Sequence, residues 1–529
     1  MTTLTVCILT AGRGSRMGEM GKILNKALFP INGKAIISHI ISQFPDSAEF
    51  VIGLGFYGEQ VKNYLQIAHN NKKFIFQEID NFDKPGSGPG YSLLCCKAQL
   101  QKPFYFVSCD TLWNNAIDWN ANHNWMGVDS VDQSVSKNYC NLKIVDRHVT
   151  ALLDKETIPD NTYQAFVGLC FIQDYSIFFD ALKNTETILG EHQISNGLKA
   201  LIKKTTVNAQ PIQWTDVGDE KKFKTMVSRY ENYDFSKQDE ALYFVNNKVI
   251  KFFSNALSAK QRVEKTKLNP SVFPVITDSI EQFYAYDFQT GNTLYQKNTP
   301  IIFKKLLKWL DEKLWIRQMI SPTIMKSSCL NFYKEKTEKR ITLYHKKYSN
   351  SDRTSKINNQ IIPAMTDLIK KIPWEILCDG IPSFIHGDLH FDHTIFNLEK
   401  NTFSLIDWRQ DFGGHVEFGD LYYDLAKMYG GIILNYDYIK LNLLTYSENQ
   451  DEIFFDFAQR FQSKNYLEIF SDFIHKKGYY LDKIQLIVSL IYLNMSPLHH
   501  YPFDKMLYAM GRQMLYNQLN KMTMDCELI

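Results

Sequence analysis

A short, continuous apolar run leads directly into a glycine-rich turn near the start of the chain. Residues Thr5 to Thr10 read TVCILT, and the next eight, from Ala11 to Gly18, include three glycines and two arginines. Such a run is typical of a strand buried in a parallel sheet. Glycines permit a tight bend and bring bare backbone N–H groups toward phosphate oxygens, while the arginines add charge. The pattern predicts a phosphate-binding turn after a buried first strand.

Helix-length segments separate further strand-like runs in the first half of the chain. These runs cover residues 50–54, 73–77 and 104–108, and a helical pattern covers residues 36–44. The alternation of strands and helices predicts βαβ units. We therefore expect an N-terminal α/β domain that is Rossmann-like and has a mainly parallel sheet.

A chain of 529 residues is too long for one typical hydrophobic core, so two or three domains are expected. Between about Lys222 and Gln238 the residues Lys, Arg, Asp and Ser become frequent. This change in composition places a domain boundary there. The predicted domains comprise residues 1–230 and 238–529.

The second domain is expected to open with a β-hairpin and to continue as a helical region. Two strand-like runs, 242–245 and 248–253, flank Asn246-Asn247, which is a favourable turn pair. After about Lys304 the chain is rich in helical patterns, apart from turns and short strands at 381–412. We see no internal repeat and no low-complexity tract.

Composition and charge disfavour several classes of protein. Fifty-nine basic and 57 acidic residues leave a formal charge of +2, which does not favour nucleic acid or an anionic membrane as a partner. Nine cysteines without a Cys-x-x-Cys pair are typical of reduced thiols. No signal-peptide pattern and no membrane-length apolar stretch occur, so we expect a cytoplasmic enzyme with no membrane insertion.

Five motifs follow one another in the first 222 residues. The glycine-rich turn continues into a Lys-x-Leu-x-Pro segment that begins at Lys26. A Gly-Ser-Gly-Pro-Gly loop and a strand ending at Asp110 come next, then the strand segment around Gly168 and finally Trp-Thr-Asp216-Val-Gly. In this order the motifs resemble the sugar-phosphate nucleotidylyltransferases, including the phosphocholine cytidylyltransferases.

The resemblance implies that a phosphomonoester oxygen attacks the α-phosphorus of a nucleoside triphosphate and that pyrophosphate leaves. Positioning and charge neutralisation then provide most of the catalysis. By carry-over, Asp110 and Asp216 bind Mg²⁺, Arg16 holds the departing pyrophosphate, and Lys26 bridges the α-phosphate and the incoming phosphate. Gly168 lines the acceptor-phosphate pocket. The residues expected to contact the nucleotide are Leu9, Ala11, Gly12, Gly14, Ser15, Gly88 and Ser92.

A second set of motifs lies in the C-terminal half. Asp388 belongs to the segment IHGDLH, and Asp407 ends the strand-like run SLID nineteen residues later. One such aspartate can orient an acceptor hydroxyl while the other binds Mg²⁺. Upstream, Lys251 lies on an apolar strand and Glu264 on a helical segment.

These motifs resemble the aminoglycoside phosphotransferase and choline kinase family, whose members share the two-lobed α+β architecture of protein kinases. The resemblance covers about residues 240–510. It implies that Lys251 contacts ATP phosphates, that Glu264 steadies Lys251, that Asp388 is the catalytic base and that Asp407 binds the metal. Asp424, on the helix after the metal aspartate, is expected to be structural, either bonding the catalytic loop or capping.

Two departures from the kinase pattern affect the prediction of activity. Where the family has a metal-binding asparagine, five residues after Asp388, this chain has His393, which suits Mg²⁺ less well than an oxygen ligand does. No glycine occurs between Gly218 and Gly291, so the loop that covers the nucleotide lacks its usual flexibility. His393 is retained as a candidate metal ligand.

Three hypotheses follow from the sequence. The first is a bifunctional enzyme that phosphorylates a small alcohol, amino alcohol or sugar with ATP and then transfers a nucleotidyl group to the phosphate. Its product would serve bacterial surface polysaccharide or lipid decoration. The second is a nucleotidylyltransferase with a degenerate kinase-like module, and the third is a nucleic-acid-modifying nucleotidyltransferase. The compact first domain favours CTP and a small acceptor, but the acceptor itself and the oligomeric state stay open.

Overall fold

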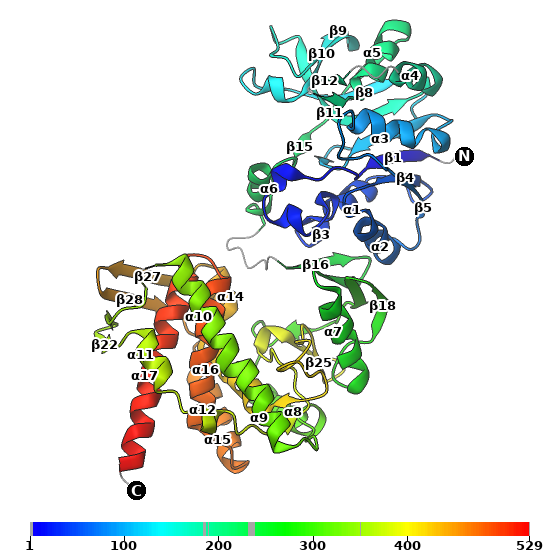
Figure 1. Cartoon of the computed structure of the whole chain (residues 1–529). Coiled ribbons are helices and arrows are strands. Elements are labelled where there is room, and N and C mark those ends of the chain that lie inside the picture. Colours follow the sequence, from blue (N-terminus) through cyan, green and yellow to red (C-terminus); the bar gives the residue numbers. More distant parts are fainter. Residues whose placement is uncertain (1–3, 184–186, 189, 231–238, 350, 528–529) are drawn as a thin grey trace. The chain divides into compact units, whose positions relative to one another are not determined.

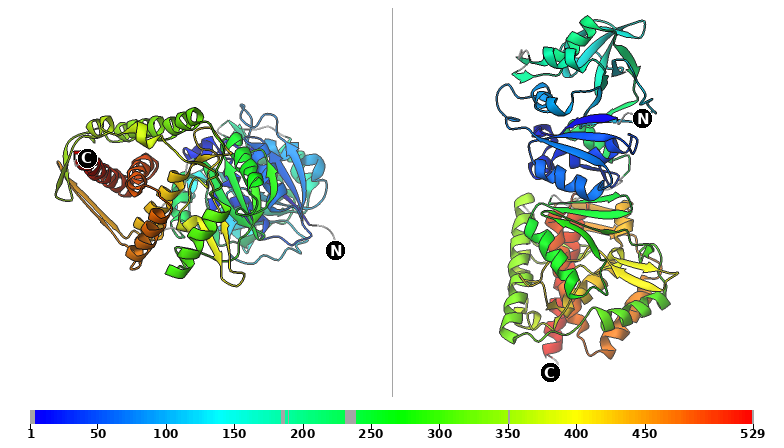
Figure 2. Two further views of the ribbon diagram at one scale, coloured as in Figure 1. Left: turned by 90° about the horizontal axis from the view of Figure 1, so that it is seen from below. Right: turned by 90° about the vertical axis from the view of Figure 1, so that its right-hand side faces the viewer.

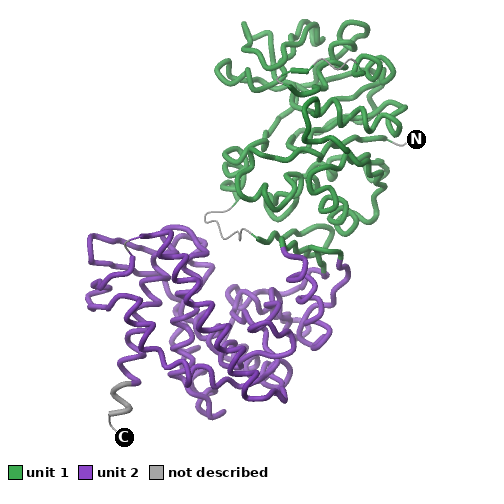
Figure 3. The backbone as a smooth tube through the Cα atoms, viewed as in Figure 1, with its two compact units in different colours: residues 1–230, 238–254, 280–285 green, residues 231–237, 255–279, 286–529 purple. Residues whose placement is uncertain are grey.

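The computed structural model describes residues 4–183, 187–188, 190–230, 239–349 and 351–527. The chain forms two compact units, shown in different colours in Figure 3. The first contains Met1–Tyr230, Gln238–Ser254 and Ile280–Ala285, and the second contains Glu231–Lys237, Asn255–Ser279 and Tyr286–Ile529. The predicted boundary at 230–238 lies almost wholly outside the described residues.

One large sheet organises the N-terminal unit (Figure 1). Its strand order is β5-β4-β1-β6-β11-β8-β14-β10-β9. The strands are β1 (Thr5–Leu9), β4 (Glu49–Leu54), β5 (Lys73–Glu78), β6 (Phe104–Ser108), β8 (Trp125–Asp129), β9 (Cys140–Val145), β10 (His148–Asp154), β11 (Tyr163–Ile172) and β14 (Asn208–Pro211). The runs predicted from the sequence at 50–54, 73–77 and 104–108 are strands, as expected.

The sheet is mixed, which corrects the prediction of a mainly parallel sheet. Strands β5, β4, β1 and β6 are parallel, as is the pair β14 and β8. Strand β11, however, runs antiparallel to β6, β8 and β9, and β10 runs antiparallel to β9 and β14. The βαβ alternation correctly predicts the strand direction only for the first half of the sheet. The strands after β6 are joined mostly through turns and hairpins, which produce antiparallel pairs.

Helices cover both faces of this sheet. Along β1, Val6 and Ile8 face one apolar cluster and Cys7 faces the other, as expected for a strand buried on both sides. The first cluster includes residues of α1 (Ile36–Ile41) and α2 (Gly58–Ala68). The second includes residues of α3 (Pro89–Cys95), α4 (Tyr175–Leu182) and α5 (Ser195–Lys204). The sheet therefore holds the carboxyl ends of its parallel strands in fixed positions.

The predicted hairpin at Asn246-Asn247 is confirmed. Strand β16 (Glu240–Val245) pairs antiparallel with β17 (Lys248–Phe253). Asn246 and Asn247 have φ angles of 50° and 61°, as a two-residue turn of type I′ requires. The hairpin packs with the N-terminal unit, where the Tyr243 hydroxyl donates to the Leu28 carbonyl over 2.7 Å.

The second unit is mainly helical, with short sheets. Helices α10, α13, α16 and α17 lie alongside one another in it (Figure 2). The principal helices are α7 (Ala256–Leu268), α8 (Pro300–Lys313), α9 (Pro322–Cys329), α10 (Lys336–Lys347), α13 (Leu421–Ile433), α15 (Ser463–Lys476), α16 (Leu481–Met495) and α17 (Phe503–Glu527). The α+β composition agrees with the prediction, and the two-lobed arrangement stays a prediction.

One small sheet of the second unit was not predicted. It has the order β22-β21-β28-β27, formed by β21 (Ser355–Ile357), β22 (Gln360–Ile362), β27 (Leu444–Asn449) and β28 (Glu452–Phe457). Strands β21 and β22 have three residues each, which is too little alternation to be recognised, whereas the six-residue strands β27 and β28 were missed within a region expected to be helical. The turn pair Asn358-Asn359, with φ angles of 43° and 69°, was the available signal. Among the described residues, none of the helices has both the length and the apolar character needed to cross a membrane.

Candidate active sites

The N-terminal site forms where two distant aspartates meet. Asp110 follows β6, and the next strand, β7 (Thr111–Trp113), pairs antiparallel with β15 (Trp214–Asp216), so that Asp216 lies opposite Thr111. The backbone N–H of Val217 donates to the Asp110 carbonyl over 3.2 Å. A Cβ atom on Gly218 would lie 2.8 Å from Asp216 Oδ1 and 3.2 Å from Asp110 Oδ2. The two predicted metal ligands therefore converge on one place.

Lys26 lies directly against Asp110. Its Nζ is 2.5 Å from Asp110 Oδ2, and the Ser108 hydroxyl donates to Oδ1 over 2.5 Å. Burial alone would raise the pKa of Asp110, but the Lys26 ammonium and these hydrogen bonds lower it to about 2. Asn25 positions Lys26, since its side chain accepts the Ala27 N–H at the start of a short 3₁₀ helix. The site therefore keeps an ionised carboxylate beside a fixed cation.

Asp216 has its own cationic partner, which the sequence analysis missed. Lys222 Nζ lies 2.5 Å from Asp216 Oδ2, and the Tyr139 hydroxyl donates to the same oxygen over 3.1 Å. The Gly218 N–H donates to Oδ1 over 2.7 Å. Lys222 also lies three residues after Asp219, the N-cap of α6 (Glu220–Val227), and this spacing was the available signal.

The glycine-rich turn runs past Lys26. Gly14 has a φ angle of 61°, and a Cβ there would lie 3.3 Å from the Lys26 Cβ. This left-handed, crowded position favours glycine over residues with a side chain. Arg16 follows on an exposed 3₁₀ turn, and Arg13 forms an ion pair with Asp83. Arg16 therefore lies on the glycine-rich turn that the sequence predicts.

The remaining predicted nucleotide-binding residues lie on two loops or on the strand and helix next to them. Leu9 ends β1 and Ala11 is buried, whereas Gly12 and Ser15 are exposed. Gly88 has a φ angle of 139° and precedes α3, where a Cβ would lie 2.7 Å from the His192 carbonyl oxygen. Ser92 is buried on α3.

Gly168 lies beside the strand end that carries Asp110. It has a φ angle of 81°, and a Cβ would approach the Ser108 Cβ to 2.8 Å and the Thr111 Oγ1 to 2.9 Å. A cavity of about 730 Å³ lies nearby, reaching Trp214 and Thr215 next to Asp216. Amide side chains dominate its polar lining: Asn114, Asn115, Gln164 and Gln213. Such a lining offers both donors and acceptors to a hydroxyl-bearing molecule.

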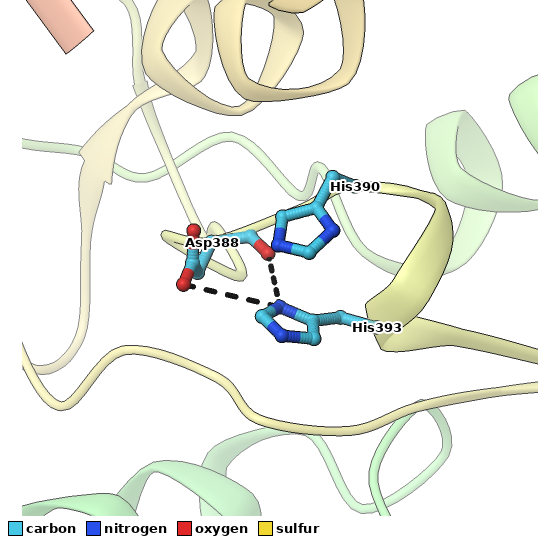
Figure 4. A group of neighbouring side chains, drawn as sticks. All are labelled: Asp388, His390 and His393. Atoms are coloured by element: carbon cyan, nitrogen blue, oxygen red, sulfur yellow. Dashed lines mark hydrogen bonds and ion pairs between the residues drawn. The ribbon is translucent and has the colours of Figure 1, made fainter. Parts of the chain in front are cut away.

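The C-terminal site is built around Asp388, His390 and His393 (Figure 4). One possible ligand atom of each lies within 4.8 Å of the others. His393 Nδ1 donates to the Asp388 backbone carbonyl over 2.8 Å, and this bond turns Nε2 toward Asp407, 3.4 Å from its Oδ2. Asp407 has a left-handed φ angle of 58°. The structure therefore brings together three residues predicted from the sequence: Asp388, His393 and Asp407.

Asp424 anchors the loop that carries Asp388, as predicted. One of its carboxylate oxygens accepts the His386 N–H and the other accepts the Gly387 N–H, both over 2.7 Å. Burial is the main cause that raises the pKa of Asp424, to about 6. His386 orients the loop too, because its Nε2 donates to the Ile406 carbonyl and its Nδ1 accepts the Asp388 N–H. These bonds hold the loop in one conformation.

Lys427 and Arg262 were missed by the sequence analysis. Lys427 Nζ lies 2.6 Å from Asp388 Oδ1, and Arg262 Nη1 lies 3.7 Å from Asp407 Oδ1. Lys427 occurs three residues after Asp424 on α13, so helical spacing placed it on the same face. Glu264 is exposed on α7, whose buried face carries Arg262 instead, and Lys251 is buried on β17 in the N-terminal unit.

Both halves of the chain match transferase families. The chain therefore combines a segment that matches a nucleotidyltransferase family with a segment that matches a phosphotransferase family. Residues 6–119 match the MobA-like NTP transferase domain, and residues 333–450 match the Phosphotransferase enzyme family. The suspected fusion is confirmed.

Curated relatives match the N-terminal part of the chain. The bifunctional protein GlmU of Methanococcus maripaludis is 27% identical over 220 residues, which are 40% of this chain and 50% of the relative. A probable glucose-1-phosphate cytidylyltransferase of Bacillus subtilis is 42% identical over 60 residues, 11% of this chain and 24% of the relative. The chain spans about half the length of the GlmU proteins it matches.

Solved structures also resemble this chain. The CTP:phosphocholine cytidylyltransferase of Streptococcus pneumoniae has 15% identity and a TM-score of 0.35, and covers 43% of this chain and 99% of its own. The inositol-1-phosphate CTP transferase of T. maritima has 13% identity and a TM-score of 0.36, and covers 43% of this chain and 96% of its own.

Proposed function

We propose that the protein phosphorylates a small hydroxyl compound with ATP and then transfers a nucleotidyl group to the resulting phosphate. The observation that carries this proposal is the convergence of Asp110, Asp216 and Lys26 in one unit and of Asp388, His393 and Asp407 in the other. A kinase produces a phosphomonoester, and a nucleotidylyltransferase consumes one. The two activities would therefore form consecutive steps.

The N-terminal site is proposed to bind Mg²⁺ through Asp110 and Asp216. Hard carboxylate oxygens together with phosphate oxygens are the ligands that this ion prefers, and the ion would neutralise charge at the α-phosphate. Lys26, which forms an ion pair with Asp110, is proposed to bridge the α-phosphate and the incoming phosphate. Arg16, exposed on the glycine-rich turn, is proposed to hold the pyrophosphate.

The C-terminal site is proposed to bind its metal through Asp407 and His393, with Asp388 as the base. His393 fits this role because its Nδ1 is occupied by the Asp388 carbonyl and its Nε2 faces Asp407. A contact between Lys251 and ATP phosphates, steadied by Glu264, remains a proposal from the family resemblance. The exposed position of Glu264 does not support its part in this contact.

Replacing His393 by asparagine should change the metal preference of the kinase. An imidazole ligand favours Mn²⁺ over Mg²⁺ relative to an amide oxygen. We expect the ratio of kcat/KM with Mg²⁺ to kcat/KM with Mn²⁺ to rise about tenfold in His393→Asn. Titration of the protein with Mn²⁺, followed by electron paramagnetic resonance, provides a readout that does not depend on turnover. An unchanged ratio and unchanged Mn²⁺ affinity would remove His393 from the metal site. His475→Asn, at an exposed histidine in the last turn of α15, is the control.

The nucleotide is proposed to be CTP and the acceptor a compact phosphate ester. The likeness to a cytidylyltransferase over 60 residues supports CTP, and the small domain supports a compact acceptor. The amide-lined cavity beside Asp216 suits a molecule with hydroxyl groups. No single side chain of this chain identifies the base, so the proposal rests on these two indications.

The proposed preference for CTP is tested by measuring kcat/KM for CTP, UTP, GTP and ATP, each with a panel of phosphate esters. A wrongly paired buried polar group costs about 1–3 kcal/mol, so CTP should be preferred about ten- to a hundredfold. Pyrophosphate release is the measurement. A clear preference for GTP, or for a hexose 1-phosphate, would show that the wrong nucleotide or acceptor has been assigned.

A further inference from the structure

Four cationic side chains lie around the proposed catalytic base, Asp388. They come from three separate parts of the second unit and are called here the basic cluster: Lys336, Arg340, Arg409 and Lys427. Lys427 Nζ is 2.6 Å from Asp388 Oδ1. Arg409 lies next to the loop of Asp388, since a Cβ on Gly387 would approach the Arg409 Cβ to 2.7 Å. All four side chains are partly exposed, so a molecule in solution can reach them.

An aromatic surface supports two of these cations. Lys336 Nζ lies 4.1 Å from the centroid of the Phe332 ring and 5.8 Å from that of Tyr423. The guanidinium carbon of Arg409 lies 4.9 Å from the same Phe332 ring. Two cations therefore share one ring, which attracts each of them but does nothing to reduce their mutual repulsion. Phe332 belongs to a π-helical segment, Leu330–Glu335, a rare geometry that occurs frequently at functional sites.

Two members of the basic cluster, Lys336 and Arg409, have no carboxylate partner among the residues that the structure describes. Asp388 is the carboxylate that Lys427 contacts. Among the residues that the structure describes, Lys336 has ring contacts but no hydrogen bond and no ion pair, and the buried Nε of Arg409 lacks a hydrogen-bond partner. Burial, with the charges of Arg409, Lys427 and Arg340, lowers the pKa of Lys336 well below its usual value. Cations held together in this way favour an anion between them.

A second basic region of the same unit shows the opposite arrangement. A cavity of about 300 Å³ is lined by several tyrosines and by cations, of which Lys347, Arg353 and Lys505 have carboxylate partners, whereas Arg512 donates to backbone carbonyls. Lys347 Nζ lies 2.6 Å from Asp504 Oδ2, and Lys505 Nζ lies 2.5 Å from Glu448 Oε2. The lack of a carboxylate partner at Lys336 and Arg409 is therefore not shared by the two lysines of this second region.

We propose that the basic cluster binds an anionic group on the hydroxyl acceptor, which makes the acceptor a hydroxy acid or an already phosphorylated alcohol. This inference rests on the proposed kinase function. The acceptor hydroxyl oxygen forms a bond to the γ-phosphorus of ATP while the bond from that phosphorus to the β–γ bridging oxygen breaks. ADP leaves, and the hydroxyl proton passes to Asp388. A cationic amino alcohol such as choline would be repelled by the same residues.

Phosphorylation by the full chain, measured as ADP release, tests the acceptor class. The probes share carbon skeletons: glycerol, glycerate and glycerol 3-phosphate in one set, glucose, gluconate and glucose 6-phosphate in the other, with choline as the cation. We expect an anionic member to exceed its neutral counterpart at least a hundredfold in kcat/KM. Comparison of the carboxylate probes with the phosphate probes then identifies which anion the site prefers. Turnover that is best with a neutral alcohol or with choline would overturn the inference while the kinase function survives.

Variants of Lys336 locate the anion. Lys336→Met should raise KM for the anionic acceptor at least tenfold and leave KM for ATP within twofold, and Lys336→Arg should restore most of the affinity. Lys339→Met is the matched control, because Lys339 is an exposed lysine on the same helix. If KM for ATP rises in Lys336→Met while KM for the acceptor does not, the cluster binds nucleotide and the inference is wrong.

Binding of inorganic phosphate, followed by calorimetry, separates this inference from the proposed function. If no probe is phosphorylated but phosphate binds to wild-type protein and to Lys339→Met and not to Lys336→Met, the kinase proposal fails and the anion site is supported. If wild-type protein binds no phosphate and phosphorylates no anionic probe, the anion site is refuted.

Discussion

Replacement of Asp110 by asparagine is expected to lower kcat/KM for nucleotidyl transfer by about 10³-fold, which corresponds to about 4 kcal/mol in the activation barrier. Asparagine keeps the shape of the side chain but removes the charge that a metal ion requires. It also removes the ion pair with Lys26, so that the cation proposed to bridge the α-phosphate and the incoming phosphate loses its fixed partner. Pyrophosphate release with saturating Mg²⁺ is the measurement.

The stability of this variant must be measured alongside its activity. Lys26 and Asp110 are both largely buried, and the loss of one partner leaves the other charge poorly compensated. A thermal melt will show whether the variant is folded at the assay temperature. Asp180→Asn is the matched control, because Asp180 is an exposed residue of α4 that pairs with Lys183 on the surface. Pyrophosphate release close to that of the control would mean that Asp110 does not bind the metal.

Replacement of Asp388 by asparagine is expected to reduce phosphorylation of the free acceptor by about 10³-fold, within the range that general acid–base catalysis contributes. Nucleotidyl transfer to an acceptor phosphate that is supplied ready-made should be unchanged, because Asp110 and Asp216 lie in the other unit. The amide cannot take the hydroxyl proton, and Lys427 loses its carboxylate partner. Both activities are measured on one preparation.

Asp367→Asn, at an exposed aspartate of the short helix α11 (Met365–Lys370), is the control for this variant. If Asp388→Asn retains phosphorylation within threefold of the control, another group accepts the proton. If wild-type protein phosphorylates none of the anionic, neutral and cationic acceptors, the second unit acts as a binding module, and the nucleotidyltransferase is the remaining activity.

Several elements could be predicted because their signals are local. The buried first strand and the turn at Asn246-Asn247 follow from an apolar run and a turn pair within a few residues. Asp110 was placed correctly at a strand end for the same reason. The role of Asp424 was instead predicted from the family resemblance, and its bonds reach residues 38 and 37 positions away. The direction of the later strands was not predictable from local signals, because pairing between strands such as β6 and β11 depends on chain segments that are far apart in sequence.

The sequence by itself determined the order of the motifs, the types of residue available for metal and phosphate, and the presence of two families in one chain. Only the tertiary structure decided which charges meet. Asp110 and Asp216 are 106 positions apart and converge through β7 and β15, and Lys336 reaches the surroundings of Asp388 from another helix. The free energy of a charge depends on its burial and on neighbours within a few ångströms. Those neighbours are brought together by packing, so local sequence patterns do not contain them.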